Sequence, residues 1–157
     1  MLTQIYTYFT SETIYLWLNY GVIPIWLALI FFPNSKLNKI FLTSIFLPVI
    51  FGAVYIYIFY QLMLLNENIL DSIGIYSGLE NLMYLFSNEL FLLIFWIHFL
   101  AINLFVGSWV SRDALKYNMP KFFSAISLIL IYFTGPLGLV AYWFVRIFFA
   151  KKISLYD

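Results

Sequence analysis

The sequence predicts an all-α integral membrane protein, a single domain with four transmembrane helices. Two observations support this prediction. Of the 157 residues, 64% are hydrophobic and 10% are charged, and no soluble core is large enough to hide that much apolar surface. Four segments also reach the roughly 20 apolar residues that a helix needs to cross a hydrocarbon core about 30 Å thick. These segments cover residues 13–32, 40–63, 90–109 and 122–145.

The first three segments are separated by polar connections. Residues 1–12 contain no Lys or Arg and no small-residue cleavage site, so they do not resemble a removable signal peptide, and we expect 13–32 to be retained as a span. A short loop leads to 40–63, and a longer polar stretch leads to 90–109. Within this longer stretch the apolar residues recur at roughly helical spacing, which predicts an amphipathic interfacial helix over 77–86.

The fourth segment contains Gly135 and Pro136 near its middle. A proline inside a helix removes one backbone hydrogen bond and tilts the axis, so we expect a single span kinked at these residues. The alternative is a re-entrant hairpin. Each arm of such a hairpin would have about 13 residues and a length of roughly 20 Å, which is too short to cross. We therefore favour the kinked span.

Lysine and arginine predict the orientation, because they are retained on the cytoplasmic side. We expect the loops 33–39 and 110–121 to be cytoplasmic and the N-terminus to be outside, in a bacterial inner membrane or a plastid-type membrane. The basic tail after residue 145 disagrees, since one further crossing would leave it outside. The residues that set the orientation are Lys36, Lys39, Arg112, Lys116 and Lys121.

Two polar side chains lie inside the third segment. His98 is near its middle, and Asn103 is about 7 Å closer to the cytoplasmic end at 1.5 Å per residue. His98 has two interpretations: it exchanges a proton, since histidine titrates near neutral pH, or it forms a hydrogen bond between helices, typically worth about 1 kcal/mol or less. Asn103 cannot exchange a proton, so it is expected to position a substrate or to bridge helices.

Several classes of site are excluded by what the sequence lacks. There is no cysteine and a single histidine, which leaves no convincing metal-ligand set. No nucleophile motif or glycine-rich phosphate loop is present. The formal net charge of +1 is far from the basic excess of a nucleic-acid-binding protein. We expect no cofactor, no metal and no nucleic-acid partner.

Several stretches in combination resemble the abscisic acid deficient four-like family. The most specific part is WIHFLAINLFVGSWVSRD at 96–113, and the resemblance covers most of the chain. Asn103 departs from the pattern, because the family usually has Asp there, and an amide keeps the shape of a carboxyl group but cannot carry a proton. The other similar stretches are IYLWLNYGVIPIWLALIFFP at 14–33, SGLENLMYLFS at 77–87, Pro120 and FTGPLGLVAY at 133–142.

The resemblance implies a small polytopic membrane protein and, for plant members, conversion of a xanthophyll epoxide into the allenic product neoxanthin. Such a reaction needs an acid at the epoxide oxygen and a base for a ring proton, both in an apolar site. His98 is the candidate for one of these roles. The residues expected to bind substrate are Asn103, Trp96, Trp109 and Thr134. Those expected to act in structure or at interfaces are Gly107, Gly135, Pro136, Arg112 and Asp113.

Three functional classes remain open. The first is an enzyme with isomerase-like acid–base chemistry on a carotenoid or another isoprenoid lipid. The second is a non-catalytic binding or assembly protein, in which the polar residues hold helices or a lipid. The third, a small transporter, has less support because the spans carry no further deep charges or paired repeats. The expected partners are membrane lipids, a carotenoid or isoprenoid ligand, and another copy of the chain or a membrane protein.

Overall fold

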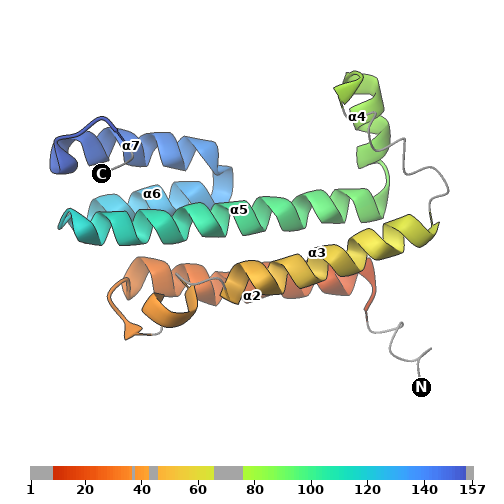
Figure 1. Ribbon diagram of the computed structural model, residues 1–157, viewed down its shortest axis with the longest axis horizontal. Helices are drawn as coiled ribbons and strands as arrows, with labels where there is room; N and C mark the ends of the chain where they lie inside the picture. The colour runs from red at the N-terminus through yellow and green to blue at the C-terminus, as the bar shows by residue number, and fades with distance from the viewer. Residues whose placement is uncertain (1–8, 37, 43–45, 66–75, 155–157) are drawn as a thin grey trace. The chain divides into compact units, whose positions relative to one another are not determined.

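The computed structural model describes residues 9–36, 38–42, 46–65 and 76–154, and the described residues form helices without any strand. The all-α class is therefore confirmed. The elements in chain order (Figure 1) are α2 (Ser11–Phe31), the short π-helical turn η1 (Asn38–Leu42), α3 (Phe46–Leu65), α4 (Leu79–Phe86), α5 (Glu89–Lys116), α6 (Lys121–Thr134) and α7 (Pro136–Ala150).

The chain divides into two compact units, which are described separately below. Unit 1 comprises Met1–Tyr20 and Val49–Leu100, and unit 2 comprises Gly21–Pro48 and Ala101–Asp157. The long helices α2 and α5 each contribute to both units.

Two helices within the described part of the chain are long and apolar enough to cross a membrane, namely α2 with 21 residues and α5 with 28. Only 22% of the most apolar stretch of α2 and 39% of that of α5 are buried, whereas the core helix of a soluble protein is mostly buried. The apolar part of α3, Val49–Leu64, is shorter, as are α6 and α7. Four membrane crossings therefore remain a prediction.

Local caps explain where the two long helices begin. The hydroxyl oxygen of Thr10 accepts a hydrogen bond from the backbone N–H of Thr13 at 3.2 Å, which satisfies one of the free donors at the start of α2. The side-chain oxygen of Asn88 does the same for Phe91 at the start of α5, at 3.1 Å. Both helices carry a glutamate in the first turn, where negative charge is favoured.

The C-terminus of α2 is capped by the side chain of Asn38, which follows this helix in the chain. Asn38 is 1% exposed, and its Nδ2 donates to the backbone carbonyls of Ala28 at 2.8 Å and Phe32 at 2.6 Å. These are carbonyls near the helix C-terminus, where partners within the helix run out. The predicted helix over 40–63 begins later than expected, at Phe46, because η1 occupies its first residues.

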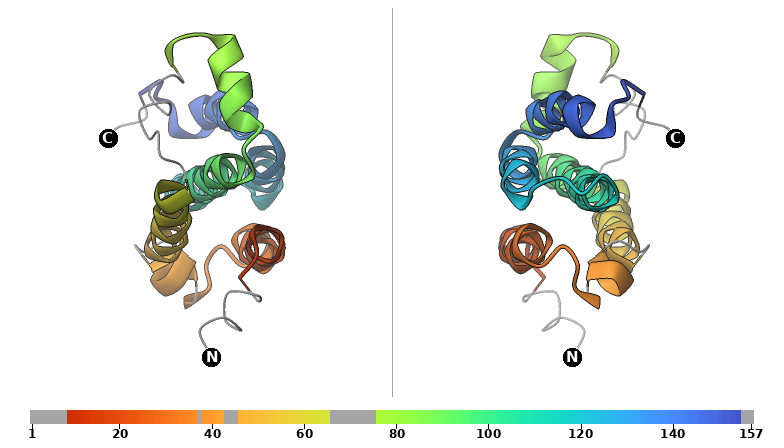
Figure 2. Two further views of the ribbon diagram at one scale, coloured as in Figure 1. Left: turned by 90° about the vertical axis from the view of Figure 1, so that its right-hand side faces the viewer. Right: turned by 90° about the vertical axis from the view of Figure 1, so that its left-hand side faces the viewer.

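The expectation of one kinked span over 122–145 is wrong. The chain reverses at Gly135, and α6 and α7 lie side by side as an antiparallel hairpin in unit 2 (Figures 1 and 2). Gly135 has a φ of 60° and a ψ of −93°, and a positive φ is open to glycine without the steric cost that a side chain brings. Pro136 is the first residue of α7, where its missing N–H costs nothing. The Gly–Pro pair thus ends one helix and starts another.

Candidate functional site

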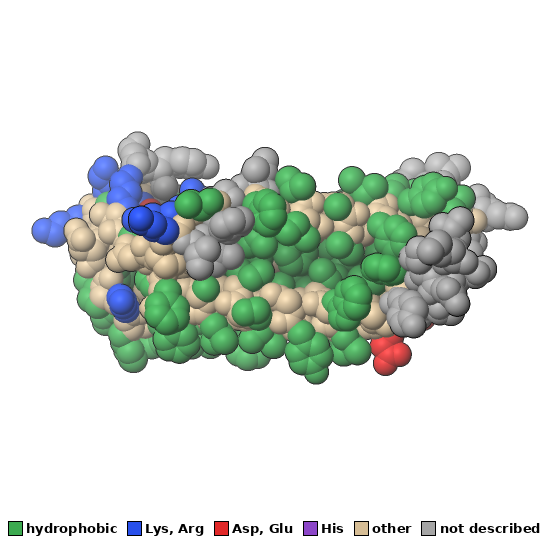
Figure 3. All heavy atoms as spheres, turned by 90° about the horizontal axis from the view of Figure 1, so that it is seen from below, with side chains coloured by type: hydrophobic (Ala, Val, Ile, Leu, Met, Phe, Trp, Pro, Cys, Tyr) green, Lys and Arg blue, Asp and Glu red, His purple; other side chains and the backbone are tan. Residues whose placement is uncertain are grey.

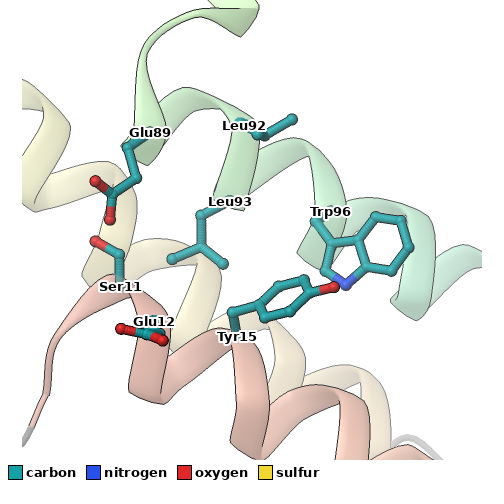
Figure 4. Close-up of a pocket in the computed structure, with 7 residues that line it drawn as sticks. All are labelled: Ser11, Glu12, Tyr15, Glu89, Leu92, Leu93 and Trp96. Carbon is teal, nitrogen blue, oxygen red and sulfur yellow. The ribbon is translucent and has the colours of Figure 1, made fainter.

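A pocket of about 350 Å³ lies in unit 1 between the first turns of α2 and the first turns of α5 (Figure 4). Figure 4 shows Glu89 of α5 pointing toward Ser11 of α2 at one end, and Tyr15 and Trp96 at the other. Leu93, which is 5% exposed, projects between these two ends. The pocket therefore joins an apolar and aromatic lining to polar groups. Its lining residues are Ser11, Glu12, Tyr15, Glu89, Leu92, Leu93 and Trp96.

Hydrogen bonds fix the aromatic end of this pocket. The indole Nε1 of Trp96 donates to the side-chain oxygen of Asn19 at 3.2 Å, and the Nδ2 of Asn19 donates to the backbone carbonyl of Tyr15 at 2.7 Å. The rings of Tyr15 and Trp96 lie 6.0 Å apart, within the usual range for aromatic pairs. Asn19, which lies one helical turn after Tyr15 on α2, therefore fixes the position of the Trp96 side chain.

His98 lies on α5 outside the pocket and is exposed. It shares one face of the helix with Phe95 and Ile102, at spacings of three and four residues, and these two side chains are each 48% exposed. The chain thus places its single histidine within an apolar, outward-facing stripe of α5, and not in the interior of unit 1.

Asn103 lies in unit 2 against the turn of the α6–α7 hairpin. Its side chain is 6% exposed, and a methyl group on Gly135 would lie 2.6 Å from its Oδ1. The buried Nδ2 of Asn103 has no hydrogen-bond partner among the described residues. Asn103 and Gly135, both singled out in the sequence, are therefore brought together, and a larger residue at either position would push the hairpin turn away from α5.

This arrangement predicts the effect of removing the amide. A buried polar group without a partner costs about 1 to 3 kcal/mol, so replacing Asn103 by Leu, of similar size, should raise the free energy of unfolding by roughly 1 kcal/mol. The measurement is unfolding of the purified protein in detergent, with Asn34→Leu at an exposed position as the control. A loss of stability on Asn103→Leu would mean that the amide holds a partner in the folded protein.

Gly107 and Trp109, also predicted from the sequence, pack inside unit 2. A methyl group on Gly107 would lie 2.5 Å from the ring of Trp26, and that ring in turn makes an edge contact with Tyr132 at 5.6 Å. Trp109 is half-buried and contacts the ring of Tyr142 at 5.7 Å. Because Gly107 has no side chain, Trp26 of α2 can approach α5 closely at this position.

Thr134 and Pro136 lie beside the hairpin turn and are exposed. The hydroxyl of Thr134 donates to the backbone carbonyl of Leu130 at 2.7 Å, a bond within its own helix. Arg112, which was expected to act in structure or at an interface, is exposed as well.

Asp113 and Arg146 form a buried ion pair in unit 2. Arg146 is 1% and Asp113 10% exposed, and the Nε of Arg146 lies 2.6 Å from the Oδ2 of Asp113. The same oxygen accepts a hydrogen bond from the hydroxyl of Tyr142 at 2.6 Å. The Nη1 of Arg146 donates to the backbone carbonyl of Ser154 at 2.6 Å, and its Nη2 donates to the hydroxyl of Tyr117 at 3.3 Å.

Arg146 and Tyr142 were not predicted from the sequence as parts of a site. Arg146 was interpreted as one charge of a basic tail, although a lone arginine at the end of an apolar run requires a partner when it is buried. Tyr142 and Arg146 are four residues apart and share a helix face, and this spacing was the available signal. The pocket residues Ser11, Glu12, Tyr15 and Glu89 were missed because they lie at the ends of segments that had been assessed for membrane crossing.

No group of three or more His, Cys, Asp or Glu side chains that could hold a metal ion occurs among the residues the structure describes. The paired groups of unit 2 form one connected set, Asp113 with Arg146 and Tyr142, in which charge and hydrogen bonds are satisfied internally. This set suits the joining of α5 to α7 better than it suits ligand binding.

Comparison with models of protein families gives a match to ABA DEFICIENT 4-like over residues 13–142. No curated protein and no solved structure matches the chain. The matched range includes the pocket residues Tyr15, Glu89 and Trp96, and also Asn103 and Gly135, whereas Arg146 follows it. Because this range covers far more than half of the 157 residues, the chain belongs to the ABA DEFICIENT 4-like family.

Proposed function

We propose that this protein is an integral membrane protein that binds a carotenoid or another isoprenoid lipid and changes its chemical form by isomerase-like acid–base chemistry. The family supports a relation to neoxanthin synthase-like proteins. The observation that carries the proposal is the pocket of unit 1, where an apolar lining meets two carboxyl groups and a phenol. Apolar pockets with a few convergent polar groups are typical of sites for small molecules.

The pocket offers the two kinds of group that such chemistry requires. Moving a proton between two atoms of a lipid needs one group that donates and one that accepts. Glu12 and Glu89 supply carboxyl groups from separate helices, and Tyr15 adds a hydroxyl group. An apolar chain would lie against Leu93 and Trp96, with its polar end among the carboxyl groups.

His98 keeps a role in the proposal, but on another surface. Since it lies in an outward-facing apolar stripe, it would act on a lipid that lies along the outside of α5 in the bilayer. Of the residues expected to bind substrate, Trp96 lines the pocket, whereas Asn103, Trp109 and Thr134 belong to unit 2. Chemistry in the pocket thus depends on Glu89, and chemistry on the outer face depends on His98.

The second candidate function is a non-catalytic binding or assembly protein. It is favoured by unit 2, where Asp113 and Arg146 bind each other and the Oδ1 of Asn103 faces the Gly135 backbone. In this case the pocket would hold a lipid without altering it.

The test is extraction and mass spectrometry of the lipids and pigments that copurify with the protein from its native membrane. We expect the chemical form of a carotenoid or isoprenoid to change in Glu89→Gln if the pocket is the reaction site, or in His98→Ala if the outer face is. Glu80→Gln removes an exposed carboxylate of α4 outside the pocket and should leave the lipid as in the wild type. The same unaltered lipid in all four proteins would overturn the enzymatic proposal in favour of a binding protein.

A further inference from the structure

We propose that unit 2 carries a basic surface that binds anionic phospholipid headgroups on the cytoplasmic side of the membrane, and that the α6–α7 hairpin is re-entrant, so that the C-terminus returns to that side. The proposal rests on the membrane placement given above but not on the isoprenoid chemistry. It is supported by the hairpin, by the distribution of charge and by the apolar side chains beside the charges.

The hairpin brings three helix ends together. Residues 117–120 connect the end of α5 to the start of α6, so these two ends are neighbours. Because α6 and α7 are antiparallel, the end of α7 returns to the same place (Figures 1 and 2). The bond of 2.6 Å between Arg146 and Asp113 confirms that the last turns of α7 lie against the last turns of α5. With 14 and 15 residues, each arm is roughly 21 to 22 Å long and too short to cross the membrane.

All eight Lys and Arg residues of the chain belong to unit 2. Figure 3 shows their side chains gathered at one end of the view. Arg146 is buried against Asp113, whereas the other seven are exposed. These exposed residues are Lys36, Lys39, Arg112, Lys116, Lys121, Lys151 and Lys152.

Large apolar side chains are exposed directly beside these charges. Phe122 follows Lys121 in α6 and is 69% exposed, Phe148 in the last turn of α7 is 80% exposed, and Ile153 follows Lys152 and is 72% exposed. Alternating cationic and apolar side chains match the boundary between phosphate headgroups and acyl chains. A soluble anion would match the charges but not the apolar neighbours.

Two hydrogen bonds hold the C-terminal segment, residues 151–154, against α7. The Nη1 of Arg146 donates to the carbonyl of Ser154, and the indole N–H of Trp143 donates to the carbonyl of Ile153 at 3.2 Å. Lys151 turns the chain with a φ of 52°. Residues 151–154 therefore fold back along α7. Lys151 and Lys152 thus stay at the end of the hairpin where α6 begins, and there the rings of Phe123 and Phe149 lie 5.8 Å apart.

A fourth crossing would place the basic C-terminal tail outside, against the rule that Lys and Arg are retained on the cytoplasmic side. The re-entrant hairpin removes this conflict. With α2, α3 and α5 crossing, the loop after α2, the end of α5 and the C-terminus all lie on one side, so every Lys and Arg is cytoplasmic. Of the acidic residues that the structure describes, Glu12, Glu80 and Glu89 then lie outside, at or before the start of α5.

The topology is tested by labelling single cysteines, which is direct because the chain has none. The variants Ser154→Cys, Asn34→Cys and Ser77→Cys, at exposed positions, are treated with a membrane-impermeant maleimide in sealed bacterial cells and in inverted membrane vesicles. We expect residues 154 and 34 to react only in inverted vesicles and residue 77 only in cells. Reaction of residue 154 in cells would overturn the re-entrant hairpin. Extraction with alkaline carbonate tests membrane integration separately, and neither measurement depends on the lipid chemistry of the pocket.

Headgroup binding is tested by native mass spectrometry of the full chain released from nanodiscs of mixed phosphatidylglycerol and phosphatidylcholine. We expect preferential retention of phosphatidylglycerol. Each Lys or Arg near an anionic surface contributes roughly fivefold to binding, so the triple variant Lys121→Gln, Lys151→Gln and Lys152→Gln should lower the preference about tenfold or more. Glu80→Gln, which alters charge outside unit 2, is the control. No preference in the wild type, or equal displacement by inorganic phosphate, would overturn the proposal.

Discussion

Gly138→Ala should break the α6–α7 hairpin and lower the free energy of unfolding by about 3 kcal/mol. A methyl group at residue 138 would overlap the backbone nitrogen of Ile131 and lie 2.6 Å from the carbonyl carbon of Leu130. Both atoms belong to the backbone of α6, which cannot move aside as a side chain can, because it is held by the helix hydrogen bonds. The two helices would have to separate, which exposes Ile131 and Tyr142, two of the most buried residues in unit 2.

Unfolding in detergent, followed by the loss of helical circular dichroism, measures this effect. The matched controls are Gly21→Ala and Gly52→Ala, because a methyl group at either position meets nothing within 4 Å. Both glycines lie in helices, where alanine is favoured over glycine by up to about 1 kcal/mol, so these variants should be as stable as the wild type or more so. Similar losses in all three variants would show that the close approach at Gly138 is not the cause.

Asp113→Asn should lower the free energy of unfolding by about 3 to 5 kcal/mol. The substitution keeps the size of the side chain but leaves the guanidinium of Arg146, 1% exposed, buried without a negative partner. Arg146→Met should cost less than Asp113→Asn, because Asp113 is nearer to solvent and its carboxylate keeps the hydrogen bond from Tyr142.

A double-mutant cycle separates this pair from its surroundings. Replacing a buried ion pair with apolar residues of similar volume is often neutral or stabilising, so Asp113→Leu combined with Arg146→Met should recover most of the stability lost in Asp113→Leu alone. Arg112→Gln is the control, since Arg112 is the exposed neighbour of Asp113 and should change the stability by less than about 0.5 kcal/mol. Additive losses in the double variant would contradict a direct pairing of Asp113 with Arg146.

The sequence was sufficient to predict the long helices, because their apolar length alone identifies them. The prediction over 13–32 agrees with α2 within two residues at each end, and α4 falls within the predicted 77–86. The third predicted segment stopped at Trp109 because hydropathy falls there, whereas α5 continues through Arg112 and Asp113 to Lys116. In these last turns Asp113 finds its partner Arg146 on α7, and a hydropathy pattern does not contain such a tertiary contact.

The hairpin was considered and set aside because its arms are too short to cross a membrane, so Gly135 and Pro136 were interpreted as a kink within one helix. The same Gly–Pro pair is also typical of a junction between two helices, because glycine is common just after the end of one helix and proline in the first turn of the next. Only the close packing at Gly138 and the contact of Asn103 with Gly135 decide between the two interpretations. The site shows the same limitation. Trp96 and Asn103 were found as unusual residues within apolar segments, but Glu12 and Glu89 come to line one pocket only through packing.

The buried position of Arg146 sets an order for assembly. An arginine is strongly disfavoured in the hydrocarbon interior without a partner, and the partner of Arg146 lies on α5, which is synthesised earlier. The arms of the hairpin are also too short for either to be inserted alone as a crossing helix. We therefore expect α7 to dock only after α5 is in place with Asp113 available, so that α7 is the last of the described helices to pack.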